Sequence, residues 1–214
     1  MAAPIDFDHP AADPLIWFNQ WFDEAKQACA RLGLRNPNAM TLATVDGPPA
    51  QGPSARIVLL KHIDERGAVF YTNRQSRKGE ALQAHPRAAL LFHWDVLDRQ
   101  VRIEGAVTLV SEGESDAYFA TRPLDSQLGA WASQQSREFA GGREQLEIAV
   151  AGVMDRFADV IKAGGNIPRP PYWGGYRVAL ETIEFWQGQP SRLHDRVLYT
   201  NKRGNKWTTA RLFP

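Results

Sequence analysis

Two adjacent cations at a predicted helix start are the first residues that could do chemistry. Arg77 and Lys78 follow Ser76, which comes shortly after a predicted strand that ends at Thr72. The free N–H groups and the positive dipole end of a helix N-terminus attract anions, and neighbouring cations strengthen that attraction. The pattern therefore indicates a phosphate site, with a basic helix start that faces solvent as the alternative.

A second candidate anion site lies further along the chain. Tyr118 and Arg122 are four residues apart, which puts them on one face if the helix there extends far enough, and Ser126 follows a short turn. A Tyr, an Arg and a Ser that converge could hold a phosphate. The alternative is ordinary turn chemistry for Ser126. Gln135 and Ser136 add neutral donors for a further polar ligand.

Three alternating side chains near the C-terminus form a third group. Arg192, His194 and Arg196 share one face if the segment is extended. Two cations and an imidazole on one face repel each other unless an anion or an acidic partner lies beside them. Trp186 could pack beside a planar ring. The alternative is that Asp195 and nearby acids neutralise them.

Two strand motifs also carry polar groups. Arg56 and Lys61 bracket a four-residue apolar strand and point to opposite faces, so they could serve different ligand groups. Gln100 can both donate and accept, as recognition of a heteroaromatic ring edge requires. For Arg56 and Lys61, the alternative is that both charges simply reach solvent from the ends of the strand. For Gln100, the alternative is an ordinary exposed strand with cross-strand ion pairs.

The motifs of several other chemistries are absent from the sequence. It contains no GxxxxGK[ST] loop, no GxGxxG after a strand, no HExxH, no Cys/His zinc cluster and no GxSxG. The single Cys29 falls near the apolar face of a predicted helix, where a buried, inert thiol is expected. We therefore expect no metal, and we expect the chemistry to reside in a bound organic cofactor.

Composition narrows the classes of protein further. The 214 residues carry 25 Lys and Arg against 24 Asp and Glu, a formal net charge of +1, which argues against a general nucleic-acid binder. No apolar run approaches the roughly 18 residues that span a bilayer, and the first residues lack a signal-peptide pattern. We expect a cytoplasmic protein with neither nucleic-acid nor membrane partners. Of the cations 19 are Arg, which composition alone attributes to coding bias.

The elements that position these residues begin with a helix. Asp13 and Pro14 are typical of its N-cap and first position, Trp17 and Trp21 begin its apolar face, and Gly33 can end it. The alternation of apolar residues predicts strands at 39–45, 55–61, 68–72, 88–94, 100–110, 176–186, 196–199 and 207–212. A turn at 64–67 joins the second and third strands as a hairpin. Further helices are predicted at 76–84, from a capping box at 111–114 through 119, and at 143–161.

The order of these elements predicts the fold class. Strands follow one another in hairpins near both ends, with helices inserted between them, which disfavours a parallel doubly wound sheet. The better prediction is a mainly β, antiparallel barrel with helices packed outside. It forms a single domain over 13–214, preceded by a flexible N-terminal arm over 1–12.

Taken together, the motifs resemble the pyridoxamine 5′-phosphate oxidase family. The matching blocks run in order from about residue 39 to the C-terminus, at 56–61, 70–73, 76–79, 99–102, 129–133, 185–188 and 192–196. The resemblance implies an FMN-binding split barrel that works as a homodimer, with the FMN site at the interface. It implies oxidation of pyridoxamine or pyridoxine 5′-phosphate to pyridoxal 5′-phosphate, with O2 as electron acceptor and H2O2 as product.

The resemblance also implies roles for individual residues. Lys61, Tyr118, Arg122 and Ser126 would hold the substrate phosphate. Arg192, Leu193 and His194 would lie against the substrate ring, with Arg192 and His194 as the catalytic residues. The implied FMN contacts are Arg56, Ile57, Val58, Leu59, Leu60, Lys61, Tyr71, Thr72, Arg77, Lys78, Gln100, Gln135, Ser136, Trp186 and Arg196.

One departure from the family pattern leaves alternatives open. Family members often carry an Arg-rich, acidic N-terminal arm that covers the substrate, whereas residues 1–12 contain no Arg. A related split-barrel flavoprotein with another substrate and a non-catalytic carrier of FMN or pyridoxal phosphate are therefore retained as alternatives. A nucleic-acid module is disfavoured by the near-zero charge.

Overall fold

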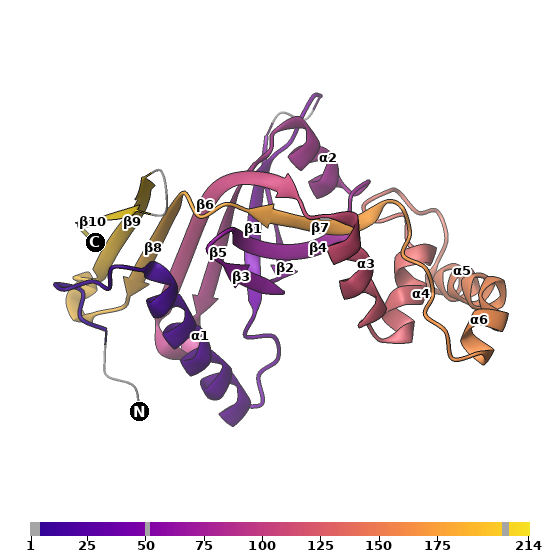
Figure 1. The fold of residues 1–214 in the computed structure, drawn as a ribbon, viewed down its shortest axis with the longest axis horizontal. Helices are drawn as coiled ribbons and strands as arrows, with labels where there is room; N and C mark the ends of the chain where they lie inside the picture. The colour runs from indigo at the N-terminus through magenta and orange to yellow at the C-terminus, as the bar shows by residue number, and fades with distance from the viewer. Residues whose placement is uncertain (1–4, 50–51, 203–205) are drawn as a thin grey trace.

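A long helix and a strongly curled sheet form the body of the molecule (Figure 1). The computed structural model describes residues 5–49, 52–202 and 206–214. Helix α1 spans Pro14–Arg31, and the side chain of Asp13 caps it by accepting a hydrogen bond from the Leu15 N–H at 2.9 Å. Gly33 follows with a φ of 64°, which lies in the left-handed region that suits a glycine after a helix end. The predicted start and end of this helix are confirmed.

The described strands form one antiparallel sheet system, which confirms the predicted fold class. The path of hydrogen-bonded neighbours runs β10-β9-β8-β6-β5-β1-β2, while β7 pairs with β6 and β4, and β3 pairs with β4. The strands are β1 Ala39–Val45, β2 Pro53–Leu59, β3 His62–Asp64, β4 Gly67–Asn73, β5 Arg87–Trp94, β6 Arg99–Leu109, β7 Trp173–Val178, β8 Thr182–Gln187, β9 Asp195–Lys202 and β10 Lys206–Arg211.

Strand β6 is where the barrel splits. Its first residues pair with β8, from Arg99 opposite Gln187, whereas its last residues pair with β7, from Val107 opposite Val178. The connection from β7 to β8 passes directly over Gly105 of β6, where an added Cβ atom would lie 1.9 Å from the carbonyl oxygen of Ala179. Only a glycine permits that approach. The predicted strand over 176–186 is therefore wrong as one element, because the crossing at this point divides it in two.

Apolar side chains of α1 fill the centre of the molecule. Trp17 and Trp21 meet the ring of Phe185 edge-on, with centroids 5.5 and 5.4 Å apart, and Trp17 also meets Tyr199 at 5.8 Å. Phe185 and Tyr199 are fully buried. Because these contacts join the helix to β8 and β9, α1 fixes the position of these two strands.

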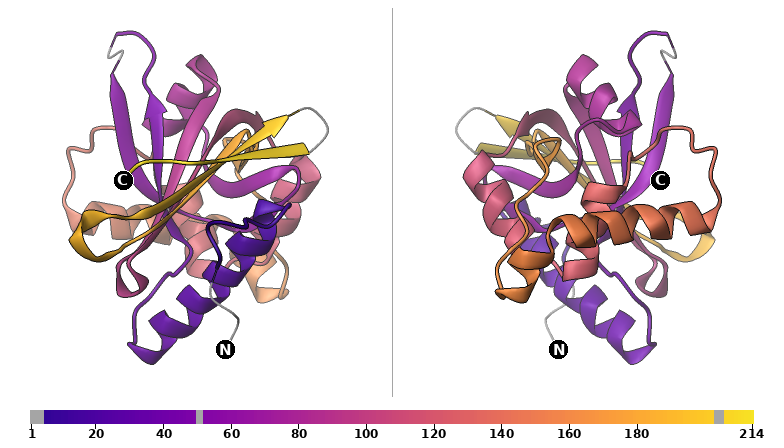
Figure 2. Two further views of the ribbon diagram at one scale, coloured as in Figure 1. Left: turned by 90° about the vertical axis from the view of Figure 1, so that its left-hand side faces the viewer. Right: turned by 90° about the vertical axis from the view of Figure 1, so that its right-hand side faces the viewer.

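Helices cover the opposite end of the molecule. Figure 2 shows α5 and α6 across the end away from β9 and β10. A second apolar cluster of Leu128, Phe157 and Ile167 holds this region together, with Trp131 packed against it. The helices after α1 are α2 Arg77–Ala84, α3 Glu112–Ala120, α4 Leu124–Ala132, α5 Arg143–Arg156 and α6 Ala158–Lys162, with short 3-10 turns η1 Asp95–Leu97 and η2 Pro190–Arg192.

Two further predictions about elements need correction. The predicted hairpin between 55–61 and 68–72 is wrong, because β2 pairs with β1 and the turn joins the short β3 to β4. That turn needs Gly67, whose φ is 140° and whose added Cβ would lie 2.3 Å from the Val178 carbonyl oxygen. The predicted helix over 143–161 is interrupted at Phe157, which has a φ of −107° and is buried in the second cluster.

The N-terminal residues that the structure describes lie against the core. Ile5 and Phe7 pack on it, and the Tyr199 hydroxyl donates to the Ala11 carbonyl at 3.0 Å. Residues 1–4 of the predicted flexible arm lie outside the described residues, and the flexibility of the arm stays a prediction. In the described part of the chain, no helix has the length and apolar character needed to cross a membrane.

Candidate functional site

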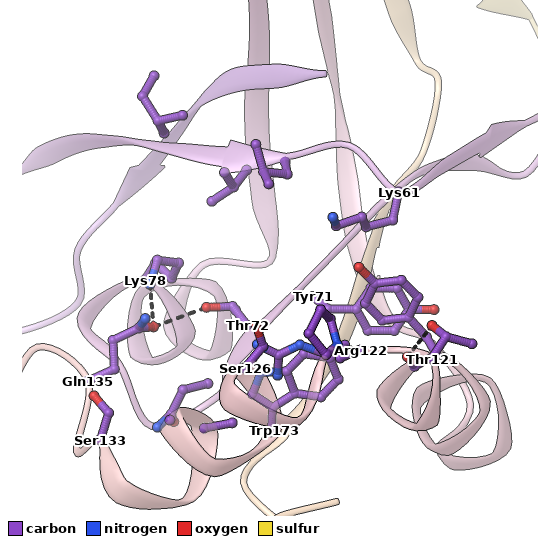
Figure 3. Close-up of a pocket in the computed structure, with 18 residues that line it drawn as sticks. Lys61, Tyr71, Thr72, Lys78, Thr121, Arg122, Ser126, Ser133, Gln135 and Trp173 are labelled. Carbon is purple, nitrogen blue, oxygen red and sulfur yellow. Dashed lines mark hydrogen bonds between the residues drawn. The ribbon is translucent and has the colours of Figure 1, made fainter. Parts of the chain in front are cut away.

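A cavity of about 680 Å³ lies between the sheet and the helical end (Figure 3). Its walls come from β2, β4 and the start of β7 on one side, and from α2, α3, α4 and their connections on the other. Three charged side chains line it, Lys61, Lys78 and Arg122, and none of the described lining residues is acidic. An anion is therefore the ligand that this cavity is charged to hold.

Lys78 is the buried cation of the cavity. Ser76 caps α2, and the Lys78 ammonium donates to the Ser76 Oγ at 3.1 Å and to the Gln135 Oε1 at 2.7 Å. Thr72 donates to the same Gln135 oxygen at 3.1 Å. Burial, with a further contribution from nearby Arg56, lowers the pKa of Lys78 to about 8. Because its hydrogen-bond partners among the described residues are neutral oxygens, no carboxylate among these partners compensates its charge.

Arg122 is the second buried cation of the cavity, and none of the described carboxylates pairs with it. Its guanidinium packs over the rings of Trp173 and Phe119, with centroid distances of 4.7 and 5.5 Å. The Nη1 atom is buried and has no hydrogen-bond partner among the described residues. Burial lowers the pKa of this guanidinium. A buried donor of this kind calls for an acceptor from a ligand.

The residues predicted to hold the substrate phosphate line one cavity, but the elements that carry them differ from those predicted. Helix α3 ends at Ala120, so Arg122 lies in the turn after it rather than one helical turn beyond Tyr118. Ser126 sits in the first turn of α4. All three line the cavity together with Lys61.

Three near-parallel rings form the aromatic part of the wall. Tyr71 stacks on Tyr118 with centroids 4.1 Å apart and planes at 16°, and on Trp173 at 5.4 Å and 9°. The Lys61 ammonium lies 5.6 Å from the centroid of Tyr118. Burial raises the pKa of Tyr71, so its hydroxyl stays protonated at neutral pH. The stack gives the cavity a rigid side against which a planar ligand can rest.

Some predicted cofactor residues do not line this cavity. Ile57, Val58 and Leu59 do, but Leu60 turns into the core. The Arg56 guanidinium donates to the Thr44 Oγ1 at 2.7 Å, and Arg77 pairs with Asp46 at 2.5 Å. Ser136 is exposed, with a φ of 71°.

The remaining predicted cofactor residues form a second, smaller cavity of about 260 Å³ on the face of β6, β8 and β9. It is lined by Leu91, Gln100, Arg102, Glu184, Trp186 and Arg196. The register explains the grouping, because Gln100 lies opposite Trp186, and Trp186 lies opposite Arg196. Side chains two residues apart share a face, which adds Arg102 and Glu184.

Of the two predicted catalytic residues, His194 contacts a residue that lines this second cavity, and Arg192 lies two positions before it in the chain. Arg192 closes the turn η2, and both Ser191 and Arg192 have left-handed φ values, 59° and 62°. The His194 ring lies 4.6 Å from the Trp186 ring, and its Nδ1 accepts from the Gln189 N–H at 3.1 Å. In the neutral imidazole the proton is therefore on Nε2, which leaves that atom as a donor.

Two expectations about this segment are corrected. Arg192, His194 and Arg196 do not share one extended strand, because β9 begins only at Asp195. Asp195 does not neutralise Arg196; it accepts from Arg211 at 2.6 Å and from the Gln189 side chain at 2.7 Å. Glu184 is the acid that binds Arg196.

Sequence reasoning missed several residues that line the two cavities. In the smaller cavity these are Leu91, Arg102 and Glu184, and the two-residue spacing from Gln100 and Trp186 could have indicated the last two. In the larger cavity, four of the missed residues lie in the sequence blocks 70–73 and 129–133, whereas no local signal marks the other three. The missed residues of the larger cavity are Asn73, Thr121, Pro123, Gly129, Ala130, Ser133 and Trp173.

The two cavities are built at different places in the chain's fold. Figure 1 shows β8 and β9, which carry Trp186 and Arg196, at one side of the molecule and α3 and α4 at the other. A single chain therefore does not gather all of the predicted site residues around one ligand.

The curled antiparallel sheet and the cavity lined by three cations define the class, which is a split-barrel protein with a site for an anionic ligand. A family model described as "Pyridoxamine 5′-phosphate oxidase" matches residues 25–156, and one described as "Pyridoxine 5′-phosphate oxidase C-terminal dimerisation region" matches residues 173–214. The chain belongs to the pyridoxamine 5′-phosphate oxidase family. This confirms the resemblance found in the sequence.

Similar proteins support the same assignment. The chain is 58% identical over 205 residues to a pyridoxine/pyridoxamine 5′-phosphate oxidase of Cupriavidus taiwanensis, covering 95% of this chain and 90% of that one. It is 55% identical over 212 residues to the protein of that name from Ralstonia pickettii, covering 99% and 94%. Among solved structures, PhzG from Burkholderia lata 383 in complex with tetrahydrophenazine-1-carboxylic acid aligns with a TM-score of 0.83 at 30% identity, covering 100% and 98%.

Proposed function

We propose that the protein is an FMN-dependent oxidase that converts pyridoxamine or pyridoxine 5′-phosphate to pyridoxal 5′-phosphate, with O2 as electron acceptor and H2O2 as product. This reaction would serve vitamin B6 salvage. The observation that carries the proposal is the cavity whose described lining residues include Lys61, Lys78 and Arg122 but no Asp or Glu. Relatives that are 55–58% identical and carry the name of this activity support it.

The cofactor end of the cavity fits a phosphate monoester such as that of FMN. Lys78 and Thr72 both donate to Gln135 Oε1, so a neutral amide oxygen stands where a phosphate oxygen would accept. The ammonium has no carboxylate partner among the described residues, and a phosphate would supply the negative charge. When bound, FMN supplies the two-electron acceptor, while the chain supplies binding and orientation.

The substrate end of the same cavity fits a second phosphate. Arg122 offers a buried, unpartnered Nη1, and Lys61, Tyr118 and Ser126 line the wall beside it. These residues would hold the phosphate of the B6 substrate. The stack of Tyr71, Tyr118 and Trp173 restricts how that end of the ligand can lie. Fixing the phosphate fixes the distance of the reacting carbon from the cofactor.

A second copy of the chain would complete the site. Strands β8 and β9, which carry Trp186 and Arg196 and flank the turn with Arg192 and His194, lie on the opposite side of the molecule from α3 and α4 (Figure 1). The match of residues 173–214 to a dimerisation region supports a homodimer. In such a dimer, the β8–β9 face of one protomer would cover the cavity of its partner.

Arg192 and His194 would act on the substrate ring in that arrangement. Arg192 would position the ring so that the exocyclic carbon, which gives up hydride, faces the cofactor that accepts it. His194 would orient the substrate through its Nε2–H, because its Nδ1 is already occupied by the Gln189 N–H. The left-handed backbone at residues 191 and 192 holds the turn in one conformation.

Anaerobic reduction of the bound flavin tests the proposal. The purified protein should show a flavin absorption spectrum, and pyridoxine 5′-phosphate added without oxygen should bleach it. Admission of air should restore the colour and release H2O2. A yellow protein that is not bleached by either phosphorylated substrate would be a carrier or act on another substrate, and a colourless protein that cannot be loaded with FMN would refute the cofactor.

The likeness to PhzG supports a second candidate, oxidation of a reduced phenazine carboxylate. The alignment covers the full chain at a TM-score of 0.83, and a carboxylate could also pair with the cavity cations. The same bleaching assay with a dihydrophenazine carboxylate separates the two. We favour the B6 substrate because Lys61, Tyr118, Arg122 and Ser126 line the cavity together, as a phosphate requires.

A further inference from the structure

Glu184 is a buried carboxylate that joins two arginines at the smaller cavity. Its side chain is only 7% exposed. Its Oε1 accepts from the Nε atom of Arg196 at 2.8 Å and forms an ion pair with the Nη2 atom of the same guanidinium at 2.7 Å. Its Oε2 accepts from Nη2 of Arg102. No other acidic residue lines this cavity in the described part of the chain.

The sheet register places these three side chains together. Arg102 lies directly opposite Glu184 on β6 and β8, and Arg196 on β9 lies opposite Trp186, two residues further along β8. All three therefore point from the same face of three adjacent strands.

Contacts to the C-terminal residues leave Arg196 with a single orientation. Its Nη1 donates to the Phe213 carbonyl at 2.8 Å, and the Leu212 N–H donates to the Arg196 carbonyl at 3.0 Å. Every nitrogen of this guanidinium is therefore engaged, and two of the three contact Glu184. If Glu184 lost its charge, these contacts would no longer be charge-assisted, and the guanidinium would be oriented less strongly.

The energetics of buried ion pairs indicate that the triad of Glu184, Arg102 and Arg196 orients its side chains rather than stabilises the fold. Burying a carboxylate between two guanidiniums carries a desolvation cost that the ion pairs barely recover, and apolar residues of the same volume often stabilise a fold as well or better. Here the triad opens onto a cavity that also holds Gln100 and Trp186. Without the carboxylate, two positive charges on neighbouring strands would repel each other.

We propose that Glu184 is a positioning residue for the cofactor ring. It holds Arg196 and Arg102 side by side on the face of Trp186 and Gln100, and it reduces the charge of that face from two positives to one. This inference rests on the proposed function, since the planar, heteroaromatic ligand is FMN. Glu184 itself need not touch the ring.

The test is the variant Glu184→Gln, which keeps the shape of the side chain and removes its charge. We expect the dissociation constant for FMN, measured by quenching of flavin fluorescence, to rise at least tenfold. We also expect the visible circular dichroism of the flavin to change at saturating FMN. A residue that only stabilised the fold would leave the spectrum of the bound flavin unaltered.

A matched control is Glu104→Gln. Glu104 contacts the same Arg102, at 3.1 Å from its Nε, but its side chain is 47% exposed and it lies outside the cavity. We expect this variant to bind FMN as the wild type does. The proposal is overturned if Glu184→Gln keeps the wild-type affinity and dichroism, or if Glu104→Gln loses both to the same extent.

Three further outcomes have different consequences. If Glu184→Gln does not fold, Glu184→Asp keeps the charge but is one methylene too short to hold both guanidiniums, so it should shift the flavin dichroism; a wild-type signal would overturn the proposal. If the wild-type protein itself binds no FMN, the proposed function fails. If the wild type binds and Glu184→Gln is unaffected, only the present inference fails.

Discussion

Replacing Lys78 by Met should move two measured quantities in opposite directions. Lys78 is 8% exposed and its hydrogen bonds in the described part of the chain go to neutral oxygens, so burial disfavours its charge. Met has a similar length and carries no charge to desolvate. The apo-protein should become more stable, whereas the affinity for FMN should fall because the phosphate loses a cation.

The magnitude follows from the lowered pKa of Lys78. A fall from 10.5 to about 8 corresponds to about 3 kcal/mol against the ammonium, at about 1.4 kcal/mol for each tenfold change. Met removes this cost together with two hydrogen bonds worth about 1 kcal/mol each. We therefore expect a gain of about 1 kcal/mol in the free energy of unfolding at pH 7. One charge-assisted hydrogen bond lost to the phosphate should weaken FMN binding about 10- to 100-fold.

The pH dependence has a definite sign. Because the pKa of Lys78 is lower in the fold than in the unfolded chain, the cost is fully present below about pH 8 and disappears above 10.5. Between these values the unfolded chain binds more protons, so the stability of the apo wild type should rise with pH relative to that of Lys78→Met. Bound phosphate raises the pKa again, so FMN binding should weaken as the pH rises above 8.

Urea unfolding of both apo-proteins at pH 7, 8, 9 and 10 measures the first effect, and titration with FMN at each pH measures the second. The reasoning is refuted if Lys78→Met is less stable than the wild type at pH 7, or if the stability difference between the two proteins does not change up to pH 10. An unchanged FMN affinity would remove Lys78 from the phosphate site.

Three further predictions concern other parts of the molecule. Arg122→Met keeps an apolar contact with Trp173 but loses the guanidinium, so the KM for pyridoxine 5′-phosphate should rise about 10- to 100-fold with an unchanged FMN content by absorbance; an unchanged KM would contradict the assignment. Arg192→Gly suits the φ of 62°, so FMN should still bind while anaerobic flavin reduction in a stopped-flow instrument slows about 100-fold or more. Equal rates would exclude a role in positioning. Asp13→Ala removes the cap of α1 and should cost about 1 kcal/mol in urea unfolding, whereas Asp13→Asn should cost much less.

Local signals in the sequence predicted much of the fold. The Asp13-Pro14 start and the capping box of Ser111 and Glu114 both form as expected, because each depends on residues within one helical turn. The order of strands and helices was enough for the fold class. The partner of β2 was not predictable in this way, because it depends on pairing with β1 rather than on the nearer turn at 64–67.

The candidate site was predictable only in part, for a related reason. Residue type indicated which side chains could bind an anion, and Lys61, Tyr118, Arg122 and Ser126 do share a cavity. Spacing alone could not show that Asp46 engages Arg77, since these residues are 31 positions apart. The same holds for Glu184 and Arg102, which meet only because β6 and β8 pair. Contacts between distant segments depend on register, which local patterns do not encode.

The separation of the two cavities has a genetic consequence. If each site combines the larger cavity of one protomer with the β8–β9 face of its partner, a chain altered at Arg122 and a chain altered at Arg192 can complement each other. A mixed dimer would contain one doubly defective site and one intact site. With random pairing about half of the dimers are mixed, so co-expression of two nearly inactive variants should restore about one quarter of the wild-type activity at low substrate concentration. Sites confined to single protomers would show no such recovery.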